Sequence, residues 1–76
     1  EYGGRGVRVN CVCPNAIRTP LVDISPPDFL EELIRPQAIK RFGEPAEVGF
    51  AVAFLCSDRS AFVTGVALPV DGGYLA

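Results

Sequence analysis

Apolar and polar positions along the chain predict two short β-strands. The run 8–13 is rich in valine, glycines precede it and Pro14 follows it, a pattern typical of a strand. Pro14 has no N–H to donate to a ladder, so we expect the strand to end there and a loop over residues 14–20 to begin. The apolar run 66–70 predicts the second strand, which Asp71 and two glycines bring to an end.

A first helix is predicted after the prolines at positions 26 and 27. Its apolar residues recur at helical spacing on one stripe, and the helix should end before Pro36. These residues are Phe29, Leu30, Leu33 and Ile34. Because the helix is short and flanked by prolines, we expect it to belong to a mobile lid rather than to the core.

A second helix is predicted from Pro45 to Cys56 or Ser57. Pro45 suits the first helical position, and Glu47 places a carboxylate in the first turn, where the helix dipole favours it. One stripe consists of Val48, Ala51, Val52 and Leu55, and the opposite side carries Phe50, Ala53 and Phe54. A helix that is apolar nearly all round is expected to be buried on two faces.

The order of strand, helical crossover and strand predicts one βαβ unit with parallel strands and a right-handed connection. Parallel strands need a covering layer on each face, and this chain can supply only one. Pro69 within the second strand indicates a sheet edge. The pattern therefore predicts the end of a larger α/β domain.

Composition and charge exclude several classes of function. The 76 residues carry seven basic and nine acidic side chains, a net charge of −2, so neither nucleic acid nor an anionic membrane surface is an expected partner. There is no histidine, which excludes a Ser-His-Asp triad and zinc ligation through histidine. No apolar run is long enough to span a bilayer and no signal-peptide pattern is visible, so a cytoplasmic location is expected.

The three cysteines are an odd number, which argues against a disulfide-stapled secreted domain. Cys11 and Cys13 lie two residues apart in the first strand, so their side chains should share a face. A metal pair could use that spacing, but the chain offers no third and fourth ligand. We therefore interpret both, together with Cys56, as buried apolar thiols.

Several motifs occur together in an order that resembles the short-chain dehydrogenase/reductase family. Residues 5–14, Arg-Gly-Val-Arg-Val-Asn-Cys-Val-Cys-Pro, with the following Asn-Ala-Ile-Arg-Thr-Pro resemble that family's sixth strand and cofactor loop. Residues 41–48 resemble the start of its helix before the last strand, and the segments 54–58, 63–65 and 70–73 resemble its C-terminal signature. The resemblance covers most of the chain, with residues 21–39 falling outside it.

The resemblance implies a fold and a nicotinamide site. The fold would be α/β, with residues 1–76 forming the C-terminal βαβ portion of a Rossmann-type doubly wound parallel sheet within a single dinucleotide-binding domain. The family's loop pattern maps onto Pro14, Ile17 and Thr19: the backbone at Ile17 would bind the nicotinamide carboxamide, and Thr19 the carboxamide or the pyrophosphate. Asn15 stands where the family usually has glycine; asparagine tolerates a positive φ, and its side chain would lie near the nicotinamide or the substrate.

The family's catalytic Tyr-x-x-x-Lys pair is not in this sequence, because Tyr2 and Tyr74 lack a lysine four residues on. Residues 3–6 do not follow a strand, so they are interpreted as a helix end and turn rather than as the Gly-rich phosphate loop. Asp71 is interpreted as a turn residue and Arg18 as a solvated loop charge. No catalytic and no metal-binding residue is therefore assigned to this chain.

The resemblance implies the C-terminal portion of an NAD(P)-dependent oxidoreductase that transfers a hydride between a nicotinamide cofactor and a small carbonyl or secondary alcohol substrate. Residues 21–40 would form the substrate lid. Neither the substrate nor the choice between NAD and NADP follows from the chain. The alternative is a truncated, non-catalytic module that binds partners through its apolar helix and edge strand.

A homo-oligomer, dimer or tetramer, is expected. If the stripe containing Val48 and Leu55 covers the sheet, Phe50 and Phe54 face away from it and form a patch that a monomer would rarely expose. The opposite assignment, with the phenylalanines inward, would place Val48, Val52 and Leu55 at the interface instead.

Overall fold

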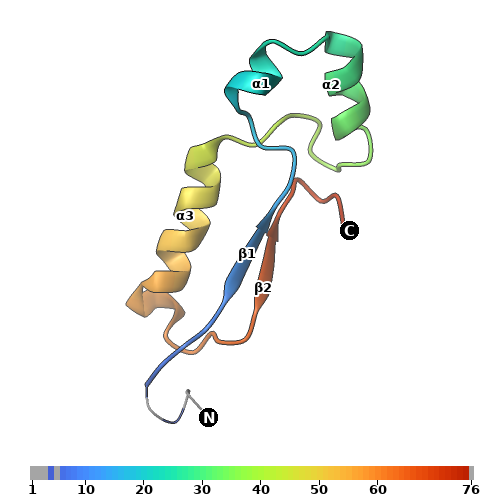
Figure 1. The fold of residues 1–76 in the computed structure, drawn as a ribbon. Coiled ribbons are helices and arrows are strands. Elements are labelled where there is room, and N and C mark those ends of the chain that lie inside the picture. The colour runs from blue at the N-terminus through green and yellow to red at the C-terminus, as the bar shows by residue number, and fades with distance from the viewer. Residues whose placement is uncertain (1–3, 5, 76) are drawn as a thin grey trace.

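The computed structural model describes residue 4 and residues 6–75 (Figure 1). The elements follow in the order β1 (Cys11–Pro14), α1 (Pro20–Asp23), α2 (Pro27–Ile34), α3 (Pro45–Cys56), the 3-10 helix η2 (Asp58–Ser60) and β2 (Ala67–Val70). The two strands run side by side, α3 lies along them, and α1 and α2 lie beyond the strand ends (Figure 1). Because residues 3 and 5 are not described, the turn expected at 3–6 lies outside the described residues.

The two strands form a parallel pair, as the sequence predicted. Cys11 pairs with Ala67, and the register continues to Pro14 opposite Val70. β2 has the predicted end but starts one residue later than expected, and β1 is shifted toward the C-terminus. Pro14 is the last residue of β1 instead of the first residue of the loop, because the ladder continues on its carbonyl side without needing its N–H.

Helix α3 covers one face of this sheet and begins as predicted, with Pro45 in its first turn. The side chain of Glu47 accepts a hydrogen bond of 2.8 Å from the backbone N–H of Glu44, which satisfies one free donor at the helix start. Leu55 is the buried apolar residue of the helix, and Val48 and Ala51 are half-buried. These three residues identify the face that packs on the strands.

The expectation that α3 is buried on two faces is wrong for this chain. Phe50 is 73% exposed, and Val52 and Phe54 are exposed as well. Periodicity shows that a helix has two apolar faces, but it does not show that both faces meet a partner within the same chain. The orientation with the phenylalanines away from the sheet is the one observed.

The three cysteines are also exposed, contrary to the prediction of buried thiols. Cys11 and Cys13 share the face of β1 that α3 does not cover, while the half-buried Val12 points the other way. Within the described residues the elements that pack against one another are β1, β2, α3 and η2. The second face of the sheet is therefore not covered by these elements, and the Cys11 and Cys13 thiols on that face are exposed to solvent.

The amino ends of the strands are joined by side chains that the sequence analysis did not single out. The amide of Asn10 donates to the Val63 carbonyl at 3.2 Å and accepts from the Val66 N–H at 3.0 Å. The Val9 N–H donates to Thr64 Oγ1, and the Val9 carbonyl accepts from Gly65. These bonds fix the strand register where the ladder itself has not yet begun.

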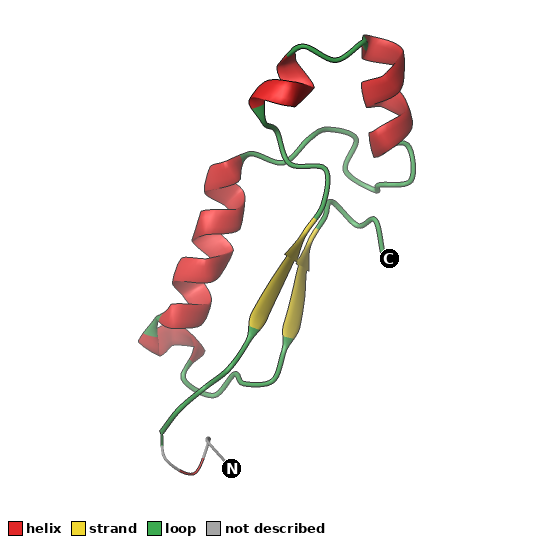
Figure 2. Cartoon of the chain, in the orientation of Figure 1, coloured by secondary structure: helices red, strands yellow, loops and turns green. Residues whose placement is uncertain are grey.

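Helices α1 and α2 stand apart from this packed unit (Figure 2). α2 has the predicted extent and ends before Pro36, whereas the single turn α1 was not predicted. The Cα radius of gyration is 15.3 Å, against about 11 Å for a compact domain of this length. No helix in the described part of the chain is long and apolar enough to cross a membrane.

Candidate functional site

The loop 14–19 leaves the carboxyl end of β1, where open α/β sheets bind ligands. The Asn15 N–H donates to the Val70 carbonyl at 3.3 Å and so ties the start of the loop to β2. Ala16, with a φ of 51°, is the non-glycine residue of the described chain that has a positive φ. The left-handed position anticipated at Asn15 therefore lies one residue later, at Ala16, where a Cβ makes this conformation costly.

Ile17 is held by a bridge that leaves its own peptide groups free. It pairs in parallel with Gly43, through bonds from Arg18 N–H to the Gly43 carbonyl at 2.7 Å and from Gly43 N–H to the Ala16 carbonyl at 3.0 Å. In such a bridge the N–H and C=O of the central residue point away from the partner segment. Within the described chain neither group of Ile17 makes a backbone hydrogen bond.

Gly43 lies close to the Ile17 side chain at this bridge. A Cβ at position 43 would lie 2.9 Å from Ile17 Cδ1, so the end of the Ile17 side chain would have to shift to admit an alanine. The glycine therefore lets the half-buried Ile17 side chain pack against the segment that leads into α3. The loop and the start of α3 are joined at this point.

Thr19 occupies the N-cap position of α1 with extended backbone, and its carbonyl accepts from the Val22 and Asp23 N–H groups. Its hydroxyl makes no capping hydrogen bond. The start of α1 is thus capped by the backbone of Thr19 alone. The hydroxyl is exposed at the mouth of the loop and available to a ligand.

Arg18 is paired rather than simply solvated. Its guanidinium lies 3.0 Å from Asp23 and 3.3 Å from Glu44, which raises the pKa of Arg18 through hydrogen bonds to both carboxylates. All three side chains are about half exposed, so these ion pairs contribute little stability. They do orient the loop relative to α1 and to the start of α3.

A cavity of about 250 Å³ opens beside this loop. Asn15 and Ile17 line one side of it, and the remaining lining comes from the segment before α3, from Glu47 and from the turn after β2. These further residues are Gln37, Ile39, Arg41, Gly43, Pro69, Val70, Asp71, Gly72 and Gly73. Of the predicted site residues, Asn15 and Ile17 line the cavity, while Pro14 and Thr19 flank them in the chain.

Gln37 builds the wall opposite the loop and is only 2% exposed. Its Nε2 donates to the carbonyls of Ile39 at 2.9 Å and Arg41 at 3.0 Å, which closes the turn between them. Its Oε1 is buried and has no hydrogen-bond partner within the described residues. Nothing in the local sequence around Gln37 indicated this burial, because it depends on the distant turn after β2.

An ion pair closes the cavity on the side of α3. The guanidinium of Arg41 donates to both carboxylate oxygens of Glu47, each at 2.8 Å. Together with the bond from the Glu44 N–H, this pairing lowers the pKa of Glu47 from 4.5 to about 2. Glu47 is therefore ionised near neutral pH and committed to two partners, so it cannot act as a general base.

The turn after β2 confirms the structural interpretation of Asp71. Its carboxylate accepts from the backbone N–H groups of Gly73 at 3.0 Å and Leu75 at 3.3 Å, and the residue is buried. Both oxygens are used to shape the turn. A cluster of three or more metal-ligating side chains does not occur among the residues that the structure describes.

Comparison with known proteins identifies the family. The family described as Enoyl-(Acyl carrier protein) reductase matches residues 1–75. The chain is 47% identical over 75 residues to cis-4-hydroxycyclohexanecarboxylate dehydrogenase of Sinomonas cyclohexanicum, covering 99% of this chain and 30% of that protein. It is 40% identical over 76 residues to meso-2,3-butanediol dehydrogenase of Serratia marcescens, covering 100% of this chain and 30% of that protein.

A solved structure agrees with this result. The crystal structure of 3-oxoacyl-[acyl-carrier protein] reductase from Brucella melitensis superposes with a TM-score of 0.90 at 39% identity, covering 97% of this chain and 28% of that one. The chain thus spans about 30% of the length of the curated relatives it matches. Its strands and α3 are part of a Rossmann-type α/β fold. The chain belongs to the short-chain dehydrogenase/reductase family.

Proposed function

We propose that the chain is the C-terminal portion of an NAD(P)-dependent oxidoreductase that interconverts a carbonyl compound and a secondary alcohol. The observation that carries the proposal is the pair of unbonded peptide groups of Ile17 at the carboxyl end of β1. The family and the dehydrogenase and reductase names of the relatives support it. The full-length protein would bind one nicotinamide nucleotide and a small substrate.

The residues present fit a nicotinamide. A carboxamide has one N–H₂ donor and one carbonyl acceptor, and the free C=O and N–H of Ile17 are their complements. The hydroxyl of Thr19 makes no capping hydrogen bond to α1, so it can donate or accept a hydrogen bond with the ligand. Pro14 fixes the backbone at the entry to the loop, and Asn15 anchors the loop to β2.

When bound, the nicotinamide supplies the hydride for the carbonyl carbon. This chain would hold the ring in one orientation, because the Gly43 bridge keeps Ile17 from rotating and the Asn15 bond fixes the loop start. The proton on the substrate oxygen would be handled by a tyrosine outside this chain, since no Tyr-x-x-x-Lys pair occurs in it.

The role of Thr19 is tested by Thr19→Ala in the full-length protein. We expect nicotinamide affinity to weaken by about 1–3 kcal/mol, because a buried polar group of the ligand would lose its partner. Isothermal titration calorimetry measures this, and Thr19→Ser, which keeps the hydroxyl, is the matched control. An unchanged affinity in Thr19→Ala would remove Thr19 from the site.

We further propose that residues 21–40 form a lid over the substrate. Among the described residues, helices α1 and α2 make no extensive contact with the strands or α3, and the apolar residues Leu21, Ile24 and Phe29 in and next to them are exposed. Such a segment opens at low free-energy cost. Gln37 and Ile39 tie the end of this segment to the cavity wall, so the movement would lie mainly before them. In the ligand-free full-length protein, we expect faster amide hydrogen exchange at 21–34 than at Val9 and Val12; equal protection would contradict a lid.

The exposed face of α3 supports the proposal of a homo-oligomer. Phe50, 73% exposed, and Phe54, 45% exposed, lie one helical turn apart and point away from the sheet. We expect Phe50→Glu with Phe54→Glu to lower the mass of the full-length protein in multi-angle light scattering, with Arg59→Glu as a charge control. If the folded double variant keeps the parental mass, the interface lies elsewhere.

A further inference from the structure

The polar side chains of the cavity are nearly all engaged with one another. Arg41 is paired with Glu47 through two bonds of 2.8 Å, and both carboxylate oxygens of Asp71 accept from N–H groups of their own turn. The Nε2 of Gln37 is shared between two carbonyls. A bound molecule would have to break these bonds to use any of these groups, and the atom left over, the Oε1 of Gln37, is a buried acceptor.

Asn15 differs from these residues in being exposed with its whole amide unbonded. Its side chain lines the cavity, and it makes no hydrogen bond within the described part of the chain. The backbone that carries this side chain is held, because the Asn15 N–H is bonded to the Val70 carbonyl. A free carboxamide offers two N–H donors and one carbonyl acceptor without any charge.

The charges around this amide discriminate against anions. Among the described residues, the lining contains one cation, Arg41, which Glu47 neutralises, and a further carboxylate, Asp71. The wall as a whole is therefore negative, and a carboxylate or phosphate placed beside Asn15 would meet repulsion without a free cation. A hydroxyl or a carbonyl meets no such penalty and can bond the amide directly.

We infer that Asn15 is a specificity-determining residue whose amide binds an uncharged oxygen substituent of the substrate, a hydroxyl or a carbonyl, next to the reacting carbonyl. This rests on the proposed function, which places the nicotinamide at Ile17, and Ile17 lines the same cavity as Asn15. Gln37 acts as a positioning residue, since it holds the opposite wall through Ile39 and Arg41.

The test is a series of ketones CH₃–CO–CH₂–X given to the full-length protein with NADH and with NADPH. X is a hydroxyl in hydroxyacetone, a methyl in 2-butanone and a carboxylate in acetoacetate. We expect kcat/KM to be highest for hydroxyacetone and lowest for acetoacetate. In Asn15→Leu, which keeps the bulk but removes the amide, the hydroxyacetone-to-butanone ratio should fall about tenfold, the equivalent of one hydrogen bond.

Asn15→Gly provides a second variant that removes the amide without adding an apolar surface, and the same ratio must fall in it. A ratio unchanged in the folded variants, or a preference of the unmodified protein for acetoacetate, overturns the inference while the proposed function stands. If none of the three ketones is reduced although the protein binds NADH or NADPH in calorimetry, the inference fails; if the protein binds neither nucleotide, the proposed function fails as well.

Discussion

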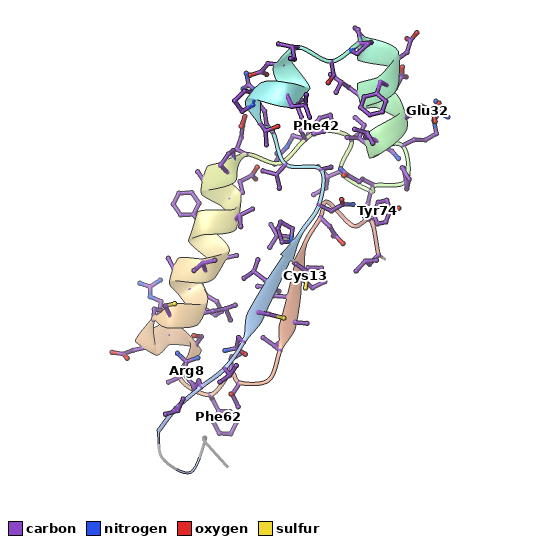
Figure 3. The ribbon with its side chains drawn as sticks, viewed as in Figure 1. Arg8, Cys13, Glu32, Phe42, Phe62 and Tyr74 are labelled. Carbon is purple, nitrogen blue, oxygen red and sulfur yellow. The ribbon has the colours of Figure 1, made fainter. Side chains whose placement is uncertain are left out.

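Replacing Arg8 by alanine should lower the free energy of unfolding of the full-length protein by about 3 kcal/mol, the cost of breaking charge-assisted bonds to partly buried carbonyls. The Arg8 guanidinium donates to the carbonyls of Leu55 at 2.9 Å and Val63 at 2.8 Å, with longer contacts to Ser57 and to Ser60 Oγ. Figure 3 shows Arg8 at the amino end of β1, beside the end of α3. Its charge also suits the negative end of the helix dipole.

The control for Arg8→Ala is Arg59→Ala, which removes an exposed arginine from η2 close to the same helix end. We expect this control to change stability by less than about 0.5 kcal/mol. Arg8→Lys keeps the charge but cannot reach both carbonyls in a fork, so it should lie between the two. Chemical denaturation followed by circular dichroism measures the free energy of unfolding of all three variants. If Arg8→Ala lowers it no more than Arg59→Ala does, the bonds from Arg8 to the Leu55 and Val63 carbonyls do not stabilise the fold.

The elements with local signals were predicted well. Helix α3 begins where it was predicted, because Gly43 and Pro45 lie close together in the sequence and both indicate a helix start at this point. α2 is framed by prolines in the same way. The strand expected at 8–13 begins at Cys11 instead, because the Val9 N–H bonds to a side chain, Thr64 Oγ1, and the Asn10 side chain takes the Val63 and Val66 backbone groups in place of a regular ladder. Such partners leave no trace in the neighbouring sequence.

One side of the candidate site could be proposed from the sequence. The loop containing Asn15, Ile17 and Thr19 could be singled out because its residues are contiguous and match a family pattern; its role in binding a cofactor stays a prediction. The opposite wall was missed, because the burial of Gln37 depends on a turn that follows it by more than 30 residues. The cysteines were placed wrongly because apolar character predicts burial only when the covering layer is in the same chain.

Replacing Gly72 by alanine should have an effect of comparable size, a loss of about 3 kcal/mol in the free energy of unfolding. The φ of Gly72 is +62°, which costs alanine about 1–2 kcal/mol. A Cβ there would also lie 2.8 Å from Gln37 Nε2 and 3.3 Å from the Ile39 carbonyl. Gln37 would have to move, and its bonds to the carbonyls that wall the cavity would break.

Gly65 separates the two causes, because its φ is +74° but no atom lies within 4 Å of a Cβ built on it. Gly65→Ala should therefore cost only the backbone term, about 1–2 kcal/mol. Combining Gly72→Ala with Gln37→Ala tests the contact itself: with the long side chain gone, the added cost of Gly72→Ala should fall toward that of Gly65→Ala, leaving only the 3.3 Å approach to the Ile39 carbonyl. If Gly72→Ala costs the same with and without Gln37, the close approach of Gln37 to Gly72 is not what requires a glycine there.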